Sequence, residues 1–445
     1  MGSLDSQNGS GRGLRSLWRR LDWHARLLLV AVVVDSLGTG AVLPIYVVYY
    51  RDVAHVPVTH IGVLIALPLV LGALTAAPAG YATDRVGVGP VLALGSVLAA
   101  SAQLVTATAH SEIGFGIGLA LLGLGMVGVN VATATLIGRT IPRPLRQPFF
   151  GIRFMTMNVC FAASGALVAF YLTLDHPQRF RQAFLADAVS WLLALTLFTI
   201  VLHSRPQPPR VLENVRASGS ELGAAAPSRG YLRLLRVSST LPLVTLAFLL
   251  GLVGYPQLNV ALPALARYEG ASSTSIGVAF AVNGLVIVAA QLYVVVRLQV
   301  VRRTRALATT ALLWGSVWAL AGLLGVVHGP VMVTLVLALC TSVFAVGETL
   351  LQPTLPAITN DVADDSDRGR FNALTNGAET SSFVVGSLAA GLLIGAGLIP
   401  WLLIGLIVLC AGAVIVAVHV LEPRLPRGSN GVVAAPTTSA SVDLA

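Results

Sequence analysis

The sequence predicts an all-α integral membrane protein of twelve transmembrane helices, arranged as two pseudo-symmetric six-helix bundles. Three observations lead to this fold class. The 445-residue chain is 56% hydrophobic and only 11% charged, whereas a soluble domain carries roughly 25% charged residues. Apolar runs follow one another along the whole chain, and about 20 apolar residues suffice to cross a bilayer. Short sequence patterns of the first half also recur in the second.

The apolar runs divide into twelve expected spans, each bounded by polar or turn-forming residues. They are residues 26–50, 59–80, 90–109, 113–138, 149–173, 182–203, 240–266, 274–296, 304–327, 330–358, 370–397 and 399–421. Only the short connections at 328–330 and 399–400 separate the ninth span from the tenth and the eleventh from the twelfth.

A long polar segment divides the chain into equal halves. Residues 204–239 are rich in Pro, Ser, Ala and Gly without apolar periodicity, which is typical of a linker. The sequence therefore predicts an N-terminal bundle at 26–203 and a C-terminal bundle at 240–421. Residues 1–25 form an N-terminal tail, and residues 422–445 are expected to be a disordered tail. The first apolar run has no small-residue cleavage site, which favours an uncleaved first helix over a signal peptide.

The arginines predict the orientation in the membrane. If the N-terminus is cytoplasmic, 24 of the 28 basic residues, all of them arginine, fall on cytoplasmic segments. Only Arg51, Arg179, Arg181 and Arg267 fall outside. An excess of basic residues on one side marks the cytoplasmic side. We therefore expect a multi-pass protein of the plasma membrane with both termini in the cytoplasm.

Composition also argues against several other classes of protein. The net charge of +9 comes from arginines spread over loops without accompanying aromatics, so a nucleic-acid partner is not expected. Cys160, Cys340 and Cys410 all lie in apolar runs, which argues against a disulfide framework or a metal site. No phosphate-binding Walker A pattern is present. We expect no enzymatic activity and no cofactor.

Three pairs of short patterns relate the two halves. The segment at 146–151, Arg-Gln-Pro-Phe-Phe-Gly, resembles the segment at 368–373, Arg-Gly-Arg-Phe-Asn-Ala. A Leu-Pro pair occurs late in span one and again late in span seven, at Pro44 and Pro263. An Ile-Gly-Val triplet begins spans two and eight. Related halves around a central site are typical of transporters.

The most specific motif lies between spans two and three. Residues 80–87 read Gly-Tyr-Ala-Thr-Asp-Arg-Val-Gly, and Asp84 and Arg85 are the only charges between about residues 56 and 109. The sequence predicts a very short polar turn here. An acid–base pair this close to lipid is costly and indicates a specific role.

On these residues the chain resembles the major facilitator superfamily. The family's motif in this position is Gly, three residues, Asp, a basic residue, one residue and Gly, matched by Gly80, Asp84, Arg85 and Gly87. The two basic residues that usually follow are replaced by Val88 and Gly89. The twelve spans, the central loop and the Arg-Gly-Arg segment at 368–370 also fit the family over about residues 26–421.

The resemblance implies a cytoplasmic gate. The family's Asp, here Asp84, faces the start of span eleven, and the basic residue, here Arg85, joins a charge network that holds the outward-facing state. Arg368 and Arg370, at the start of span eleven, would add attraction to Asp84. A helix N-terminus favours an anion, which supports this placement. The alternative is a turn in which Asp84 is solvated and caps a helix.

Three acids lie deep inside expected spans and are candidates for proton coupling or substrate binding. They are Asp35 in span one, Glu348 in span ten and Glu379 in span eleven. An ionisable residue inside the membrane is a functional hypothesis by default. The alternatives are an acid that fixes helix packing at Asp35, an arginine partner for Glu348, and a pair with Arg153 for Glu379. Asp187 lies nearer the outer end of span six, where we expect water to solvate it.

Buried amides are the next candidates. Asn130, Gln257, Asn259 and Asn283 lie in spans that would surround a central cavity. They could bind substrate, or bond between helices, since buried amides need partners.

These observations predict a secondary transporter with alternating access.

 The chain is expected to act as a monomer in a lipid bilayer, with a small-molecule substrate and protons as its partners. We expect proton-coupled efflux of a hydrophobic or amphiphilic drug or secondary metabolite, because the spans show few acids and no buried arginine suited to anionic substrates. The alternatives are uptake of a small neutral or cationic metabolite, or a receptor or assembly partner that transports nothing.

Overall fold

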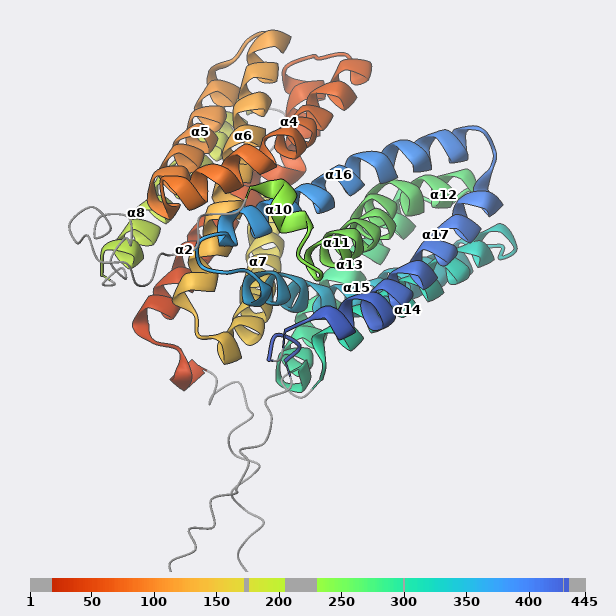
Figure 1. Cartoon of the computed structure of the whole chain (residues 1–445). Helices are drawn as coiled ribbons and strands as arrows, with labels where there is room; N and C mark the ends of the chain where they lie inside the picture. Colours follow the sequence, from red (N-terminus) through yellow and green to blue (C-terminus); the bar gives the residue numbers. More distant parts are fainter. Residues whose placement is uncertain (1–17, 172–175, 205–229, 299–300, 427, 432–445) are drawn as a thin grey trace, which may run out of the picture.

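The computed structural model describes residues 18–171, 176–204, 230–298, 301–426 and 428–431. Within this part of the chain, twelve helical segments are long and apolar enough to cross a membrane, as the sequence predicts. Six form an N-terminal bundle and six a C-terminal bundle, which Figure 1 shows as the red-to-yellow and the green-to-blue groups of helices.

The first six spans are helical along most of their length. They are α2 (Trp23–Val42, continued by short helical segments to Val53), α4 (Val58–Arg85), α5 (Val88–Thr108), α6 (Glu112–Thr140), α7 (Arg143–Tyr171) and α8 (Pro177–Ser204). Pro44 interrupts the first span, since a proline has no N–H to donate to the preceding turn.

The last six spans follow the same order. They are α11 and α12 (Thr240–Val253 and Leu262–Tyr268), α13 (Ser273–Arg297), α14 (Arg303–Ala321), α15 (Pro330–Val362), α16 (Arg368–Gly395) and α17 (Ile399–Ile415, continued to Leu421). A break at Gly254 and a wide helical turn at Gln257–Ala261 separate α11 from α12.

Two expected boundaries are wrong in a way that matters for function. The motif at residues 80–87 is not a turn, because α4 continues through Asp84 to Arg85 and only Val86 and Gly87 connect it to α5. Span five begins at Arg143 rather than at residue 149, with Pro148 inside the helix. The polar residues at the end of α4 and at the start of α7 therefore lie within these helices and do not mark their ends.

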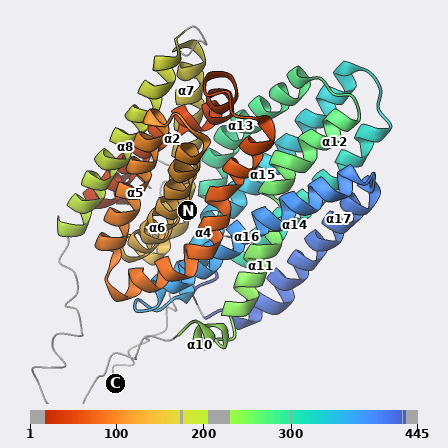
Figure 2. The same cartoon turned by 90° about the horizontal axis from the view of Figure 1, so that it is seen from above.

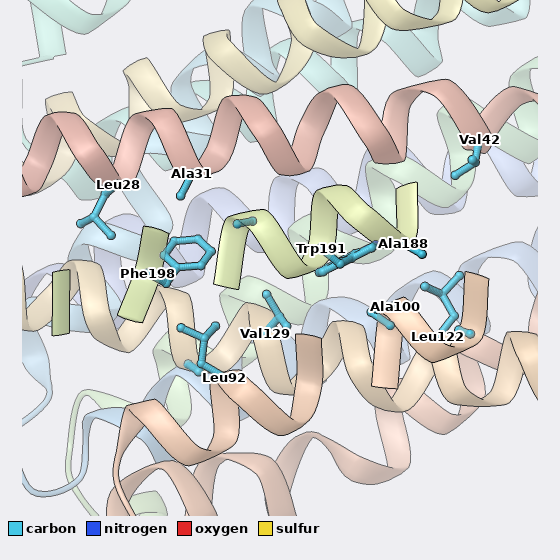
Figure 3. Packing of buried hydrophobic residues seen from close by; sticks show 14 of the residues in the cluster. Leu28, Ala31, Val42, Leu92, Ala100, Leu122, Val129, Ala188, Trp191 and Phe198 are labelled. Atoms are coloured by element: carbon cyan, nitrogen blue, oxygen red, sulfur yellow. The ribbon is translucent and has the colours of Figure 1, made fainter. Parts of the chain in front are cut away.

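Each bundle has a hydrophobic core of its own. In the N-terminal bundle, Leu28, Leu92, Val129, Trp191 and Phe198 pack between α2, α5, α6 and α8, as Figure 3 shows. In the C-terminal bundle the largest buried side chains include Trp314 and Trp318. Two separate cores allow each bundle to move as a unit, as alternating access requires.

The two bundles meet mainly along three pairs of helices. α4 packs against α16, and α7 packs against α13 and α15. Every hydrogen bond between the bundles that the described residues make lies toward the end where α4 and α15 finish and α7 and α16 begin. We call this end, which also holds residues 428–431, the closed end. Toward the other end the bundles diverge, and Figure 2 gives the second view of their arrangement.

The tails and the linker are partly described. In the linker, Tyr231–Leu235 form the short helix α10, and its Tyr231 hydroxyl donates to the carbonyl of Ala77 in α4. Burial raises the pKa of Tyr231 to about 12. The expectation of disorder from residue 422 onward is wrong for 422–426 and 428–431, which fold against α14. Residues 1–17, 205–229 and 432–445, covered by the other tail and linker expectations, lie outside the described residues.

Candidate functional site

The three acids expected to be functional share a level in the bundle. Asp35, Glu348 and Glu379 each lie roughly 11 to 14 residues from the closed end of their helix. At 1.5 Å per residue this is about 16–21 Å, which is near the middle of a bilayer. Transporters of this architecture place substrate and coupling ions at that level.

Asp35 faces a small cavity inside the N-terminal bundle. The cavity is about 70 Å³ in volume, and its polar lining comes from Asp35 and Thr39 of α2, Asn130 and Thr133 of α6, and Arg153 of α7. A water molecule needs roughly 10–15 Å³ of such space, so the cavity has room for several waters. It is far smaller than the roughly 300–1,000 Å³ of a drug-sized site. The cavity therefore suits water and protons rather than a large substrate.

Arg153 is the functional candidate that the sequence alone assigns wrongly. Because span five was expected to begin at residue 149, Arg153 counted as a cytoplasmic arginine. In the structure it lies ten residues into α7 and faces the Asp35 cavity. The expectation that the spans hold no buried arginine is therefore wrong. No ion pair joins Arg153 to Glu379 among the described residues, and Arg153 instead faces the cavity that Asp35 lines.

Asp35 and Arg153 interact across the cavity without a direct bond. Asp35 Oδ1 and Arg153 Nε are both buried, and neither has a hydrogen-bond partner among the described residues. A buried charge is costly unless another charge or water compensates it. The two side chains therefore bring an acid and a base together at a cavity large enough for water.

Asp187 belongs to a buried network next to this pair. It is fully buried, which overturns the expectation that water solvates it. Gln103 Nε2 donates to Asp187 Oδ2 at 2.6 Å, and Ser190 Oγ lies 3.0 Å from Oδ1. The hydroxyl of Tyr46 in turn donates to Gln103 at 3.0 Å. Gln103, a polar residue in an otherwise apolar span, is the sequence signal that could have located this network.

Glu348 lies in a polar cluster of the C-terminal bundle. Its side chain is buried at 4% exposure and accepts hydrogen bonds from Tyr255 and from Asn283, whose Nδ2 lies 3.5 Å from Oε2. Gln352 Nε2 donates to the Tyr255 hydroxyl at 2.6 Å. No arginine pairs with Glu348 within the described chain, so the suggested arginine partner is absent there. Neutral donors alone stabilise this carboxylate.

Glu379 differs from Glu348 in having no side-chain hydrogen bond or ion pair among the described residues. It lies on α16, one of the C-terminal helices that pack against the N-terminal bundle. Tyr255 lies near both Glu348 and Glu379. Among the described residues, Glu379 therefore has no bonded partner, whereas the nearby Glu348 has two.

The four candidate amides have different positions. Asn130 is exposed and lines the Asp35 cavity. Asn283 joins the Glu348 cluster and also donates to the carbonyl of Thr341. Gln257 donates to the carbonyls of Leu252 and Gly386, which is a packing role, and Asn259 bonds only its own helix at Tyr255. Two of the four amides therefore remain near the candidate acids.

At the closed end, Asp84 caps the first turn of α16. Its Oδ1 accepts from the N–H of Gly369 at 2.6 Å, and its Oδ2 accepts from the N–H of Arg370 at 2.9 Å. The Nε of Arg370 lies 3.8 Å from the same carboxylate. The Asp84 side chain is only 1% exposed. A carboxylate at a helix N-terminus satisfies free N–H groups and the helix dipole together.

The other motif residues support this contact in different ways. Gly80 lies against Ala373, and a Cβ there would come within 2.7 Å of the Gly369 carbonyl oxygen. Gly87 has φ of 99°, which glycine adopts readily, at the turn into α5. Arg85 is exposed and donates to the hydroxyl of Tyr81 at 2.5 Å in its own helix. The guanidinium carbon of Arg370 also lies over the Tyr81 ring, 5.0 Å from the ring centroid.

Arg368 and Arg370 bind acids of their own connecting segment. Arg368 pairs with Asp365 at 2.5 Å, and Arg370 pairs with Asp367 at 3.1 Å. Both arginines are buried at the start of α16. These two ion pairs stabilise the first turn of α16 in the conformation that Asp84 binds.

A second contact at the closed end was missed from the sequence. Asp361, at the end of α15, pairs with both Arg146 of α7 and Arg303 of α14, the latter at 2.6 Å. Gln147 of α7 joins them by accepting from Arg303 Nε at 3.2 Å and donating to Thr354 at 3.1 Å. All three charged side chains are less than a tenth exposed. We call Arg146, Arg303 and Asp361 the arginine lock.

Within the residues that the structure describes, no three His, Cys, Asp or Glu side chains come together. The three cysteines are buried and unpaired.

One protein-family profile matches the chain in two segments. Residues 28–264 and 244–442 match the sequence profile described as Major Facilitator Superfamily. The two matches together cover both bundles.

Two curated relatives come from Mycobacterium tuberculosis strains. Both are described as uncharacterised MFS-type transporters, and each is 29% identical to this chain over 201 residues. The alignment covers 44% of this chain and 43% of each relative, so it spans less than half of their length.

Solved structures share the fold at low sequence identity. The human organic anion transporter MFSD10 (TETRAN) is 19% identical with a TM-score of 0.66, covering 88% of this chain and 98% of that one. A bacterial homologue of the iron transporter ferroportin, in an outward-facing state with soaked iron, is 13% identical with a TM-score of 0.69. It covers 90% of this chain and all of that one.

Proposed function

Because the chain belongs to the major facilitator superfamily and is a membrane transporter, we propose that it couples protons to the export of a hydrophobic or amphiphilic organic compound. Transport proceeds by alternating access between the two bundles. The observation that carries the coupling is the pair of Asp35 and Arg153 at a water-sized cavity near the middle of the helices.

The contacts between the bundles at one end of the molecule support alternating access. The bundles bond to each other only toward the closed end within the described residues, through Asp84 and through the arginine lock. The arginine distribution of the sequence favours a cytoplasmic position for this end. With this orientation, we assign the structure to an outward-facing state, in which substrate can leave toward the outside.

Asp35 is the proposed proton site. In the outward-facing state its carboxylate faces Arg153 and the cavity, and both have an unpartnered buried atom. Uptake of a proton by Asp35 removes one charge of the pair and leaves Arg153 uncompensated. This changes the balance that holds α2 and α7 together. Protonation can therefore favour a different arrangement of the bundles.

Glu348 and Glu379 are the proposed substrate-side acids. They lie on α15 and α16, the C-terminal helices next to the N-terminal bundle, and neither has an arginine partner among the described residues. An unpaired carboxylate in such a place attracts a cation or a hydrogen-bond donor. The same observation favours the second candidate function, the uptake of a small cationic metabolite.

Flux measurements in proteoliposomes test the proposal. We use the amphiphilic cation ethidium and an uncharged hydrophobic dye as probes, with an imposed pH gradient of either sign. Wild-type protein should move a probe against its gradient and move protons in the opposite direction. Asp35→Asn should abolish the response to the pH gradient. Glu112→Gln, which changes an exposed acid paired with His60, is the control and should transport normally.

Two outcomes would overturn parts of the proposal. Undiminished pH-driven flux in both Asp35→Asn and Glu348→Gln would remove the coupling assignment. Proton and probe movement in the same direction would replace export by uptake.

A further inference from the structure

The C-terminal segment at residues 428–431 makes an unexpected set of contacts with α14. The N–H of Arg303 donates to the carbonyl of Asn430 at 3.1 Å, and the N–H of Thr304 donates to Asn430 Oδ1 at 3.0 Å. Asn430 Nδ2 also lies 3.1 Å from the Thr304 hydroxyl. The residue before α14, Arg302, makes no capping bond with its side chain. Asn430 therefore caps α14 from more than 120 residues away.

The same segment covers the guanidinium of Arg303. Arg303 Nη1 donates to the carbonyl of Ser429 at 2.9 Å as well as to Asp361 at 2.6 Å. Gly431 has φ of 85°, and a Cβ there would lie 3.1 Å from Arg303 Cγ. Ser429 is buried, and its hydroxyl lies 3.5 Å from the Asp361 carbonyl. The segment thus touches two of the three members of the arginine lock.

We propose that residues 428–431 act as a strap, in which Asn430 is a positioning residue that holds Arg303 in place and thereby keeps the closed end shut. The strap binds the C-terminal bundle and does not itself touch Arg146. It acts through Arg303 and Asp361, which reach α7 at Gln147 and Arg146. A covered ion pair also couples more strongly than one exposed to water.

The strap has a consequence for regulation. Residues 428–431 lie outside the helices, so they can leave their site without unfolding one. When it leaves, Arg303 loses the Ser429 carbonyl and its helix loses its cap, while the contact between Asp84 and α16 remains. The strap therefore adjusts how readily the closed end opens, independently of the Asp84 contact.

A pair of truncations tests this inference. One protein ends after Pro426 and lacks the strap, and the other ends after Gly431 and keeps it. The reporter is Thr83→Cys, a fully buried position of α4 that faces the start of α16. Its hydroxyl bonds only within its own helix, to Ala79. Cys160, Cys340 and Cys410 are replaced by alanine in all proteins.

The measurement is the rate at which a water-soluble maleimide labels the reporter in purified protein in nanodiscs. Loss of the strap should raise the rate by about five- to tenfold, the factor expected when one or two buried hydrogen bonds are lost. The protein that ends after Gly431 should label at the full-length rate. Equal labelling of all three proteins would overturn the inference. Fast labelling of the protein that ends after Gly431 would also overturn it, since the effect would then belong to residues 432–445.

Point variants separate positioning from folding. Asn430→Ala in the full-length chain should label faster than wild type. Asn430→Asp keeps the oxygen that caps α14 and should restore most of the slow rate, because aspartate is also a good helix cap. Size-exclusion profiles show whether each protein is folded. Equal rates for Asn430→Ala and wild type would show that Asn430 positions nothing.

Discussion

The carboxylate of Asp84 in α4 lies 2.6 Å from the backbone nitrogen of Gly369 in α16, so one bundle caps a helix of the other. Its second oxygen accepts from the next N–H, that of Arg370. This cap exists only while the bundles are together at this end. It therefore contributes directly to the preference for the closed arrangement, and changes to it should alter that preference.

Asp84→Asn should favour opening of the closed end. An amide keeps one acceptor, but it loses the charge that the helix N-terminus stabilises. Hydrogen bonds to charged groups contribute about 1.5–3 kcal/mol. We expect the open population to rise roughly tenfold. Spin labels at the exposed positions Val86 and Ser366 would measure the separation of the bundles. Glu112→Gln, at the opposite end of the N-terminal bundle, should leave the distances unchanged.

Gly369→Ala should have a similar effect for a steric reason. A Cβ at Gly369 would lie 2.6 Å from Asp84 Oδ1 and 2.8 Å from the Gly80 carbonyl oxygen. The same helix offers a matched control, because a Cβ at Gly391 meets no atom within 4 Å. Both substitutions raise helix propensity by about 1 kcal/mol. Only Gly369→Ala should lengthen the distance between the labels, and equal distances in the two variants would contradict the close contact.

Much of the fold follows from the sequence because its causes are local. Each span has enough apolar residues to cross a membrane, and hydropathy alone locates twelve of them. The boundaries are harder, because helices extend beyond the membrane when polar residues find partners there. Asp84 and Arg153 show this clearly. Asp84 was placed in a turn after span two, but it lies within α4. Arg153 was placed near the start of span five and counted as cytoplasmic, but it lies ten residues into α7.

The candidate site is less predictable for the same reason. The depth of Asp35, Glu348 and Glu379 follows from position along a helix, but their partners depend on which helices pack together. Nothing local pairs Asp361 with Arg303, 58 residues away, or brings Asn430 to Thr304. The repeat that relates Arg146 to Arg368 was visible, and it did point to two helix starts at the closed end. It could not show which acid each arginine binds.

Asp361→Asn should destabilise the protein strongly. It leaves two buried guanidiniums, those of Arg146 and Arg303, without their shared carboxylate. Breaking a buried ion pair in this way costs about 3–5 kcal/mol. The melting temperature in detergent should therefore fall by several degrees. Asp365→Asn is the comparison, because its side chain is 83% exposed and pairs with a single arginine. That change should cost under about 1 kcal/mol, and an equal loss in both variants would contradict the lock.

Asp35 and Arg153 should be energetically coupled. Asp35→Asn and Arg153→Gln each leave one polar group of the cavity without its counterpart, so each should lower stability. The double variant should be less unstable than the sum, with a coupling of about 1–2 kcal/mol, as residues in contact or in one network show. Stability is measured by chemical unfolding in detergent. Asp35→Asn combined with Arg302→Gln, which breaks a distant pair with Glu422, should be additive. Additivity of both double variants would mean that the cavity does not couple its two charges.

The two glutamates of the C-terminal bundle should respond differently to the same change. Glu348→Gln replaces an acceptor that receives hydrogen bonds from Tyr255 and Asn283. The new amide brings two N–H donors toward these donors, so we expect a loss of about 1–3 kcal/mol and a lower melting temperature. Glu379 makes no such bonds among the described residues, so Glu379→Gln should melt at or above the wild-type temperature.

Ligand binding should also distinguish Glu379 from Glu348. If Glu379 meets a cationic substrate, Glu379→Gln should weaken the binding of ethidium by about tenfold or more, while an uncharged dye binds as before. Its lack of protein partners is the reason, since an acid kept unpaired in the membrane is costly and persists where a ligand compensates it. Fluorescence titration of both dyes on the purified variants measures the difference. An equal loss of affinity for both dyes would show that Glu379 contributes to the shape of the site and does not recognise the charge of the ligand. An unstable Glu379→Gln protein would show that Glu379 has a structural partner.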